Sequence, residues 1–367
     1  MANLAEMINA FLGRFLGEDR RKLFIAFLYR AKYNSKNLLR KKEKYTTEHF
    51  ADVSLLNRKS FASKEIYRGN CFYGTGENLR IYSGATKCLK ACIEHGVYFG
   101  DYVNFKELDK SGLPALITFG PKRVEHIKAK SKVPTICIGP YVAYAEPLLT
   151  IQQTSYMKSL FGKTLLVFPS HSIDTMGVYY DVEDFINRIN EEKNANDIDT
   201  VLICLYYKDV ERELVSKYRD AGFKVVTAGY REDMSFLSRL RSIIDISDLT
   251  LSNSVGTHIG YCAYLGKPHK VIVQDISCEA RSILDKRDLE ATLSSEREKE
   301  QREVAQTFSR FTPCLTIEQE KVLNKYWGFD QVRSRSELRE LFQLCETAYK
   351  AGRNNRQEVF AELLKTF

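Results

Sequence analysis

The 367-residue sequence lacks long apolar runs. Nowhere do about 18 uncharged apolar residues follow one another, the length that a membrane-spanning helix needs. It also lacks the basic start, apolar core and small-residue cleavage site of a secretory signal. We therefore expect a cytoplasmic protein that does not span a membrane.

Cysteines are present, but they form no framework. The nine cysteines are odd in number, and no two of them are separated by the two residues of a CxxC pair. We interpret them as free thiols in a reducing compartment. The nearest pair, Cys88 and Cys92, is expected to pack on one face of a helix.

Several catalytic motifs are also missing. There is no P-loop lysine motif, no GxGxxG with a downstream acid, no HExxH and no GxSxG. Kinase-like NTPases, dehydrogenases, zinc proteases and hydrolases of the GxSxG type thereby lose their sequence support. The acidic pairs Asp197/Asp199 and Asp245/Asp248 do not follow strands at an expected cleft. We predict chemistry that uses no metal and no cofactor.

Positive charge is concentrated near the N-terminus. The chain has a formal net charge of +8, and the segment from Arg14 to Lys44 alone holds eleven Lys/Arg against three Asp/Glu. Apolar residues recur there at helical spacing: Phe11, Leu12, Phe15, Leu16, Leu23, Phe24, Phe27 and Leu28. This pattern is typical of a helix on an anionic membrane, so we consider the inner face of the plasma membrane as a peripheral location. A helix packed on the folded body is the alternative. Nucleic acid is not expected, because no recognition motif or basic stripe continues into the rest of the chain.

Residues 163 to 273 alternate short apolar runs with amphipathic stretches, which predicts a doubly wound parallel sheet. The expected strands are Leu165 to Pro169, Val201 to Tyr206, Lys224 to Ala228, Leu249 to Ser252 and Lys270 to Val273. The expected helices are Val182 to Glu192, Asp209 to Ala221, Met234 to Ile244 and Gly256 to Leu265.

The first half predicts a smaller sheet of the same kind. Its expected strands are Arg80 to Ser83, Ala91 to Glu94, Ala115 to Phe119 and Thr135 to Ile138, with a helix from Pro121 to Ala129. After Val273 we expect packing helices over Glu279 to Arg310 and Ser334 to Leu364.

The fold class is thus α/β, with two Rossmann-like doubly wound domains facing a central cleft and helices at both ends. We predict a basic helical segment (1–50), an acceptor-side α/β domain (51–155), a nucleotide-sugar-binding domain (156–330) and a packing helix (331–367). Each α/β domain is expected to have its own core. Ligands bind such folds at the carboxyl ends of the strands.

The stretch from Ser252 to Tyr261 follows a predicted strand and opens a predicted helix. Small hydroxyl residues and glycine let backbone N–H groups approach a phosphate, and the helix N-terminus favours negative charge. We predict a phosphate-binding turn made of Ser252, Ser254, Gly256, Thr257 and His258. An ordinary helix cap is the alternative.

Two further groups of residues are expected at the same sheet edge. His171 follows the first strand of the second domain, where it can donate to a phosphate oxygen or to a leaving group. Tyr206 and Tyr230 end the next two strands and are candidates to line the pocket for a nucleotide base and ribose, or they are loop-surface residues.

A candidate general base lies in the first half. The run IEHGVYFGD from Ile93 to Asp101 places Glu94 and His95 at a strand end before a glycine-rich turn. Displacing a nucleotide from a sugar with inversion needs a base to deprotonate the acceptor hydroxyl, and either residue can serve. A tight loop with surface charges is the alternative.

The segments Ile93 to Asp101, Leu116 to Gly139, Val167 to Asp184 and Leu251 to Pro268 resemble bacterial surface-polysaccharide glycosyltransferases of GT-B architecture, those of capsule and O-antigen gene clusters. They are similar in style to sialyl- and Kdo-type transferases. In those enzymes an acidic-Gly element holds the base, and a His-Pro element and a Ser/Thr pair hold the CMP phosphate.

This resemblance implies that Glu94 with His95 supplies the base, and that His171 and the pair Ser252 and Ser254 hold the phosphate. The sequence departs from the pattern where serine follows His171 and where His95 precedes the glycine.

The expected function is a glycosyltransferase that moves a sugar from a nucleotide-sugar donor to a growing surface glycan or lipid-linked acceptor, inverting and metal-independent. A CDP-glycerol-type polyol phosphate transferase and a non-catalytic nucleotide-binding scaffold protein remain alternatives.

Overall fold

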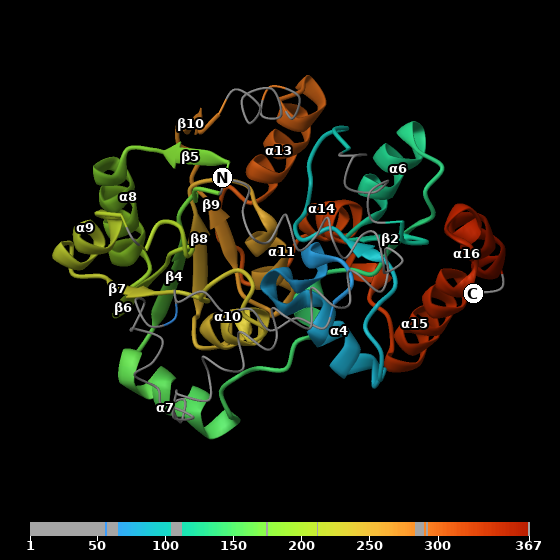
Figure 1. Ribbon diagram of the computed structural model, residues 1–367. Helices are drawn as coiled ribbons and strands as arrows, with labels where there is room; N and C mark the ends of the chain where they lie inside the picture. Colours follow the sequence, from blue (N-terminus) through green and yellow to red (C-terminus); the bar gives the residue numbers. More distant parts are fainter. Residues whose placement is uncertain are drawn as a thin grey trace, which may run out of the picture.

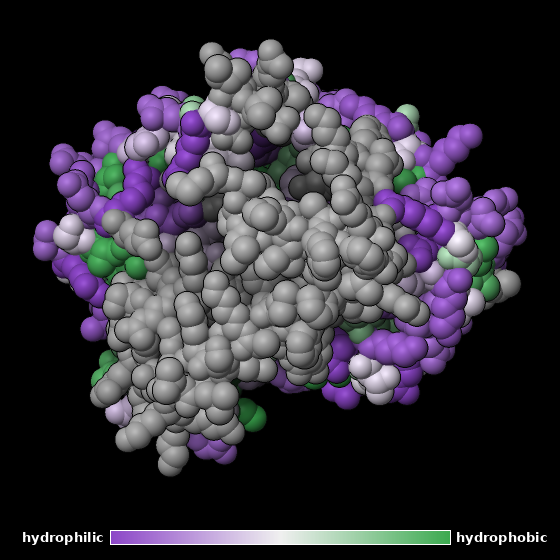
Figure 2. Space-filling view, viewed as in Figure 1, coloured by the Kyte–Doolittle hydropathy of each residue, from purple (hydrophilic) through white to green (hydrophobic). Residues whose placement is uncertain are grey.

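The computed structural model describes residues 56, 65–103, 112–173, 175–210, 212–282, 290 and 293–365. The basic segment 1–50 lies outside these residues, so its expected helix stays a prediction. In the described ranges, none of the helices has the length and apolar character needed to cross a bilayer. The described surface in Figure 2 is mostly hydrophilic, with scattered hydrophobic residues.

Two parallel sheets organise the chain, as the sequence predicts. The first has the strand order β1-β2-β3, and the second has the order β7-β6-β4-β8-β9. Their bounds are β1 (Cys92–Ile93), β2 (Leu116–Thr118), β3 (Thr135–Cys137), β4 (Thr164–Phe168), β6 (Thr200–Cys204), β7 (Lys224–Val226), β8 (Leu249–Ser252) and β9 (His269–Val271). A separate antiparallel ribbon pairs β5 (Met176–Tyr179) with β10 (Ser277–Ala280).

Helices flank both sheets (Figure 1). Their bounds are α4 (Thr75–Ser83), α6 (Pro121–Lys130), α7 (Ile151–Phe161), α8 (Val182–Ala195), α9 (Leu214–Asp220), α10 (Phe236–Asp245), α11 (Thr257–Tyr264), α13 (Ser295–Thr307), α14 (Ile317–Trp327), α15 (Arg335–Lys350) and α16 (Arg356–Leu364). The described residues also form the short 3-10 helices η2 (Arg68–Gly74), η3 (Tyr141–Tyr144), η4 (Phe329–Gln331) and η5 (Arg353–Asn355).

Helices cover both faces of the second sheet. Successive side chains of each strand point to opposite faces and pack against different helices. Leu165 and Val167 of β4 pack with Phe185 of α8 and Tyr218 of α9. Leu166, between them, belongs to the cluster that contains α10 and α11. This is the doubly wound arrangement, and it explains why every residue of β4 is buried and all but Thr164 are apolar.

The apolar core differs from the expected pair of separate cores. One continuous cluster joins Ile117 of the first sheet to Leu166 of the second, and it also includes Leu323 of α14 and Leu341 of α15. The two halves therefore share buried side chains. Helices α14, α15 and α16 lie beside the first sheet although they follow the second in sequence (Figure 1). The expected boundaries at 155 and 330 stay predictions.

Local sequence signals explain several helix ends. Pro121 occupies the first turn of α6, where its missing N–H costs nothing. Thr150, Thr316 and Ser334 begin α7, α14 and α15 with capping boxes, in which side chain and backbone satisfy each other's donors.

Three expectations about secondary structure are wrong. Arg80 to Ser83 is the last turn of α4, which is supported by an ion pair between Glu77 and Arg80 and ends at left-handed Gly84. Glu279 lies in the strand β10, which ends at Ala280, and the helix α13 covers only Ser295–Thr307 of the expected range. Cys88 and Cys92 share no helix, because Cys92 lies in β1 and Cys88 in the loop before it.

Candidate functional site

A cavity of about 1130 Å³ lies between the two halves. Its walls include the ends of β4, β6 and β8, the start of α11 and one side of α13, and the first half contributes Tyr73, His95, Gly96 and Tyr98. The cavity therefore lies where the sequence places the cleft, at the carboxyl ends of the parallel strands of the second sheet.

The strand order explains why the cavity is there. Beginning from β4, the chain adds β6 and β7 on one side of it and then β8 and β9 on the other. The connections after β4 and β8 consequently leave in opposite directions, which opens a crevice between their ends. Phe168 and Ser252, the last residues of β4 and β8, are register partners at this crevice.

The turn after β8 is held by buried hydrogen bonds. Ser252 is fully buried, and its hydroxyl donates to the Ser254 carbonyl at 2.8 Å. The ring of His269 lies between the hydroxyls of Thr250 and Ser252, with nitrogen–oxygen distances of 2.8 and 3.0 Å. Burial lowers the pKa of His269 well below its usual value. Ser252 thus stabilises the turn on the side away from the cavity, while Ser254 lines the cavity.

Asn253 joins this turn to the end of β4. Its side-chain oxygen accepts hydrogen bonds from the backbone N–H and the hydroxyl of Ser170, at 2.7 and 2.9 Å. The Ser170 and Ser254 hydroxyls are 2.7 Å apart. Two hydroxyls from two strand ends therefore converge in front of α11.

Thr257 links the turn to the first half. Its hydroxyl oxygen accepts a 3.0 Å hydrogen bond from the Val97 backbone N–H, and its carbonyl accepts one from the Trp327 indole at 3.1 Å. Gly256 precedes it, and a Cβ there would lie 2.8 Å from the His258 ring. The turn is thus fixed in place before any ligand binds.

His258 stacks on Phe168, with ring centroids 4.9 Å apart and an interplanar angle of 16°. Burial, and secondarily the charge of His171, lowers the pKa of His258 to about 3. Its Nε2 atom is buried and has no hydrogen-bond partner among the residues that the structure describes. The ring is therefore neutral at pH 7 and carries an unused polar atom in the cavity wall.

His171 follows β4 and lines the cavity 4.2 Å from the Tyr206 ring, between centroids. Its loop is fixed by Asp209, a buried residue whose carboxylate accepts from the Ser172 backbone N–H at 3.0 Å and from Arg212 at 3.1 Å. Burial lowers the pKa of His171. Tyr206 reaches across to the first half, where its hydroxyl is 3.1 Å from that of Tyr73.

His95 lines the cavity from the opposite side. The Tyr98 hydroxyl lies 3.2 Å from its Nε2 and 3.4 Å from its Nδ1, and the Phe72 ring packs edge-on at 5.2 Å. Burial, and then the charge of Arg231, lowers the pKa of His95 to about 4. At neutral pH the imidazole is unprotonated and able to accept a proton.

Glu94 is engaged elsewhere. Both of its carboxylate oxygens accept hydrogen bonds from Arg123, the shortest at 2.6 Å, and one also accepts from Thr118 at 2.7 Å. Arg123 is buried. Glu94 does not line the cavity, and neither does Tyr230, which is buried edge-to-face against Tyr207.

Sequence reasoning missed part of the cavity lining. Among the described residues that line the cavity, the formally charged ones are Arg297, Glu298 and Arg302, all on α13. Two cations against one anion suit an anionic ligand. In the sequence these residues belong to a charged helix like many others, and only the fold shows that this helix lies at the cavity. Asn253, by contrast, lies inside the predicted turn but is not among the residues predicted to bind phosphate.

Comparisons with known proteins identify no family. No protein-family model and no curated protein matches the sequence. Among solved structures, the chain is similar to the UDP complex of MnaA from S. aureus (TM-score 0.37, 10% identity, 74% of this chain and 69% of that one). It is also similar to UDP-GlcNAc 2-epimerase from Neisseria meningitidis bound to UDP-GlcNAc (TM-score 0.33, 11% identity, 90% and 97%). A third similar structure is TarM (TM-score 0.29, 11% identity, 76% and 51%). Similarity at these TM-scores gives no information about the activity of this chain.

Proposed function

We propose that the cavity binds a nucleotide-sugar and that the chain is an inverting glycosyltransferase acting on a hydroxyl of a glycan or lipid-linked acceptor. The observation that carries the proposal is the position of the Ser254 to His258 turn. It lies at the point where the strand order of the second sheet reverses, and it opens a helix toward the cavity.

The donor phosphate is proposed to lie against this turn. The Ser254 hydroxyl and the N-terminus of α11 offer donors and partial positive charge without a metal. His171 and Tyr206, which pack together on the neighbouring wall, are proposed to contact the nucleoside. Arg297 and Arg302 add positive charge on the other side of the cavity. The nucleotide-sugar is the donor substrate, and the proposed reaction needs no separate cofactor.

His95 is proposed as the general base, in preference to Glu94. The acceptor oxygen attacks the anomeric carbon, its proton passes to the imidazole, and the bond from that carbon to the phosphate oxygen breaks. The departing phosphate keeps the electron pair and remains on the turn. His95 suits this role because it is unprotonated and faces the cavity, whereas the Glu94 oxygens are occupied by Arg123 and Thr118.

A transfer assay with a panel of nucleotide-sugars and mixed glycan acceptors tests this function. Mass spectrometry should detect a glycosylated product or, without acceptor, slow release of nucleotide. Ser254→Ala should reduce the reaction by weakening donor binding, while Ser216→Ala, an exposed hydroxyl on α9, should leave it unchanged. Nucleotide binding with no turnover of any donor would instead favour the non-catalytic scaffold. Release of CMP from CDP-glycerol would favour the polyol phosphate transferase.

We also propose that the basic segment from Arg14 to Lys44 attaches the protein to the inner face of the plasma membrane. Each basic residue near an anionic surface contributes roughly 1 kcal/mol. Deleting residues 1 to 44 should abolish sedimentation with anionic vesicles. Equal sedimentation of the full-length and shortened proteins would refute this attachment.

A further inference from the structure

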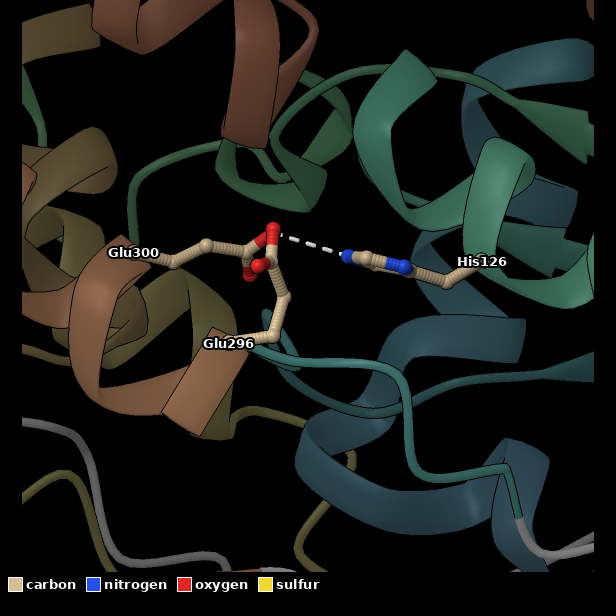
Figure 3. Close-up of side chains that lie close together, drawn as sticks. All are labelled: His126, Glu296 and Glu300. Carbon is tan, nitrogen blue, oxygen red and sulfur yellow. Dashed lines mark hydrogen bonds and ion pairs between the residues drawn. The ribbon is translucent and has the colours of Figure 1, made fainter. Parts of the chain in front are cut away.

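A histidine and two glutamates meet where α6 lies beside α13, and Figure 3 shows their side chains pointing toward one another. His126 comes from α6, and Glu296 and Glu300 come from α13. Because the two glutamates are four residues apart, they share one face of the helix. One ligand atom from each of the three residues lies within 4.8 Å of the others.

We propose that His126, Glu296 and Glu300 bind a divalent cation of the zinc class, which ties α6 to α13. This site goes beyond the proposed transfer reaction, and none of its residues lines the cavity. Zinc binds imidazole nitrogens and carboxylate oxygens, and a site with three protein ligands leaves a fourth position to water. Magnesium suits the site less, because it prefers oxygen ligands and keeps most of its water.

The geometry needs only small movements to close on an ion. The His126 Nε2 and a Glu300 oxygen are 2.8 Å apart. Ligand atoms in a tetrahedral zinc site lie about 3.3 Å from one another, given bonds of about 2.0–2.1 Å. The other Glu300 oxygen accepts a 2.6 Å hydrogen bond from the Gly100 backbone N–H, which orients the carboxylate. Such outer contacts are characteristic of metal ligands.

Charge favours a cation as well. Glu300 is almost fully buried, with 2% of its side chain exposed, and a second carboxylate is directed at the same point. The nearby Lys122 ammonium is 3.9 Å from Glu296 and is shared with Glu125 at 3.4 Å, so it compensates only part of this charge. If His126 and Glu300 formed only a buried ion pair, the position of the Glu296 carboxylate beside them would remain unexplained. A divalent ion uses all three residues and balances both carboxylates.

The site would act on the cavity through α13. Arg297 and Gln301, each next in sequence to one of the glutamates, line the cavity. The loop at Gly100 also packs against this helix, since a Cβ on Gly100 would lie 2.7 Å from the Cβ of Arg297. A cation held between α6 and α13 would thus hold one wall of the cavity against the first half of the molecule.

Zinc titration of the full chain tests the proposal after chelator treatment and desalting. Calorimetry should show one equivalent bound, with affinity reduced tenfold or more in Glu296→Gln and Glu300→Gln. Glu320→Gln, which removes an exposed carboxylate on α14 outside the cluster and its ion pairs, should bind like wild type. The unfolding temperature should rise with zinc in wild type and Glu320→Gln, and not in the two cluster variants.

Free cysteines also bind zinc, so cobalt(II) serves as the second probe. Cobalt in the proposed site gives visible bands without a thiolate charge-transfer band, because its ligands are nitrogen and oxygen. Glu296 is partly exposed, with 37% of its side chain accessible, so its variant is expected to fold. The proposal is overturned if folded wild type binds no zinc, if Glu296→Gln binds it equally well, or if all cobalt bands carry the thiolate signature.

Discussion

Replacing His258 by phenylalanine should change how the stability of the protein depends on pH. Burial lowers the pKa of this histidine from 6.5 to about 3 in the folded chain. In the unfolded chain the His258 ring therefore takes up a proton near pH 6.5, whereas in the folded chain it stays neutral until the pH approaches 3. Stability from the neutral ring is fully present above pH 6.5 and is lost as the pH falls toward 3.

The size of the effect follows from these two values. At pH 5 the unfolded histidine is mostly protonated, whereas the folded one is not. Relative to pH 8, the difference costs about 2 kcal/mol of unfolding free energy. This figure hardly changes if the folded pKa is a unit higher, because pH 5 still lies above it. Phenylalanine keeps the stack on Phe168 and cannot titrate.

Urea unfolding of both proteins at pH 8 and pH 5 measures this difference. Wild type should lose about 2 kcal/mol more than His258→Phe between the two pH values. His95, His171 and His269 contribute to the acid sensitivity of both proteins, so only the difference between them reports His258. Equal pH dependence in the two proteins would mean that His258 is not buried neutral, and the packing described for the turn would be wrong.

Three other substitutions have defined outcomes. Ser254→Ala should weaken nucleotide binding about tenfold or more, because a hydrogen bond to a charged group contributes roughly 1.5–3 kcal/mol. Calorimetry measures this change, and unchanged affinity would show that the phosphate does not bind at this turn. His95→Asn should lower kcat by about 10²- to 10⁴-fold with nucleotide affinity retained. Because the pKa of His95 is about 4, the wild-type rate should decline only as the pH falls toward that value, and a decline near pH 6.5 would contradict the assignment. Gly260→Ala should destabilise the fold by about 1–3 kcal/mol or more, because the added Cβ would lie 2.1 Å from a ring carbon of the buried Trp327. Urea unfolding measures this loss, and a variant as stable as wild type would show that the contact is looser than described.

The second sheet was predictable because its strands fall in short runs rich in apolar and β-branched residues, bounded by turn residues. The first sheet was harder. Arg80 to Ser83 carries the β-favouring pair Ile81 and Tyr82, but the ion pair from Glu77 and the cap at Gly84 make it the end of a helix. Local composition gave no means of weighing those contacts.

The position of the candidate site was predictable where its residues follow the strands. The turn from Ser252 to His258 could be located because a strand end and a helix start are both visible in sequence. The roles of the individual residues in the turn could not be predicted. Only the fold shows that Ser252 is buried away from the cavity and that Ser254 lines it. Likewise, nothing local separates Glu94 from His95. The partner that occupies Glu94 is Arg123, which lies 29 positions further along the chain.

Nucleotide binding at the turn is the claim on which the proposed function depends, and a thermal-shift screen tests it most directly. UDP, GDP, CMP, CDP and dTDP would be added in turn to wild type, Ser254→Ala and the control Ser216→Ala. At a free concentration 100 times its dissociation constant, a bound nucleotide stabilises the fold by about 2.7 kcal/mol. The account predicts that at least one nucleotide raises the unfolding temperature of wild type and Ser216→Ala, and raises that of Ser254→Ala clearly less. It is contradicted if no nucleotide shifts wild type, or if the nucleotide that does so shifts all three proteins equally.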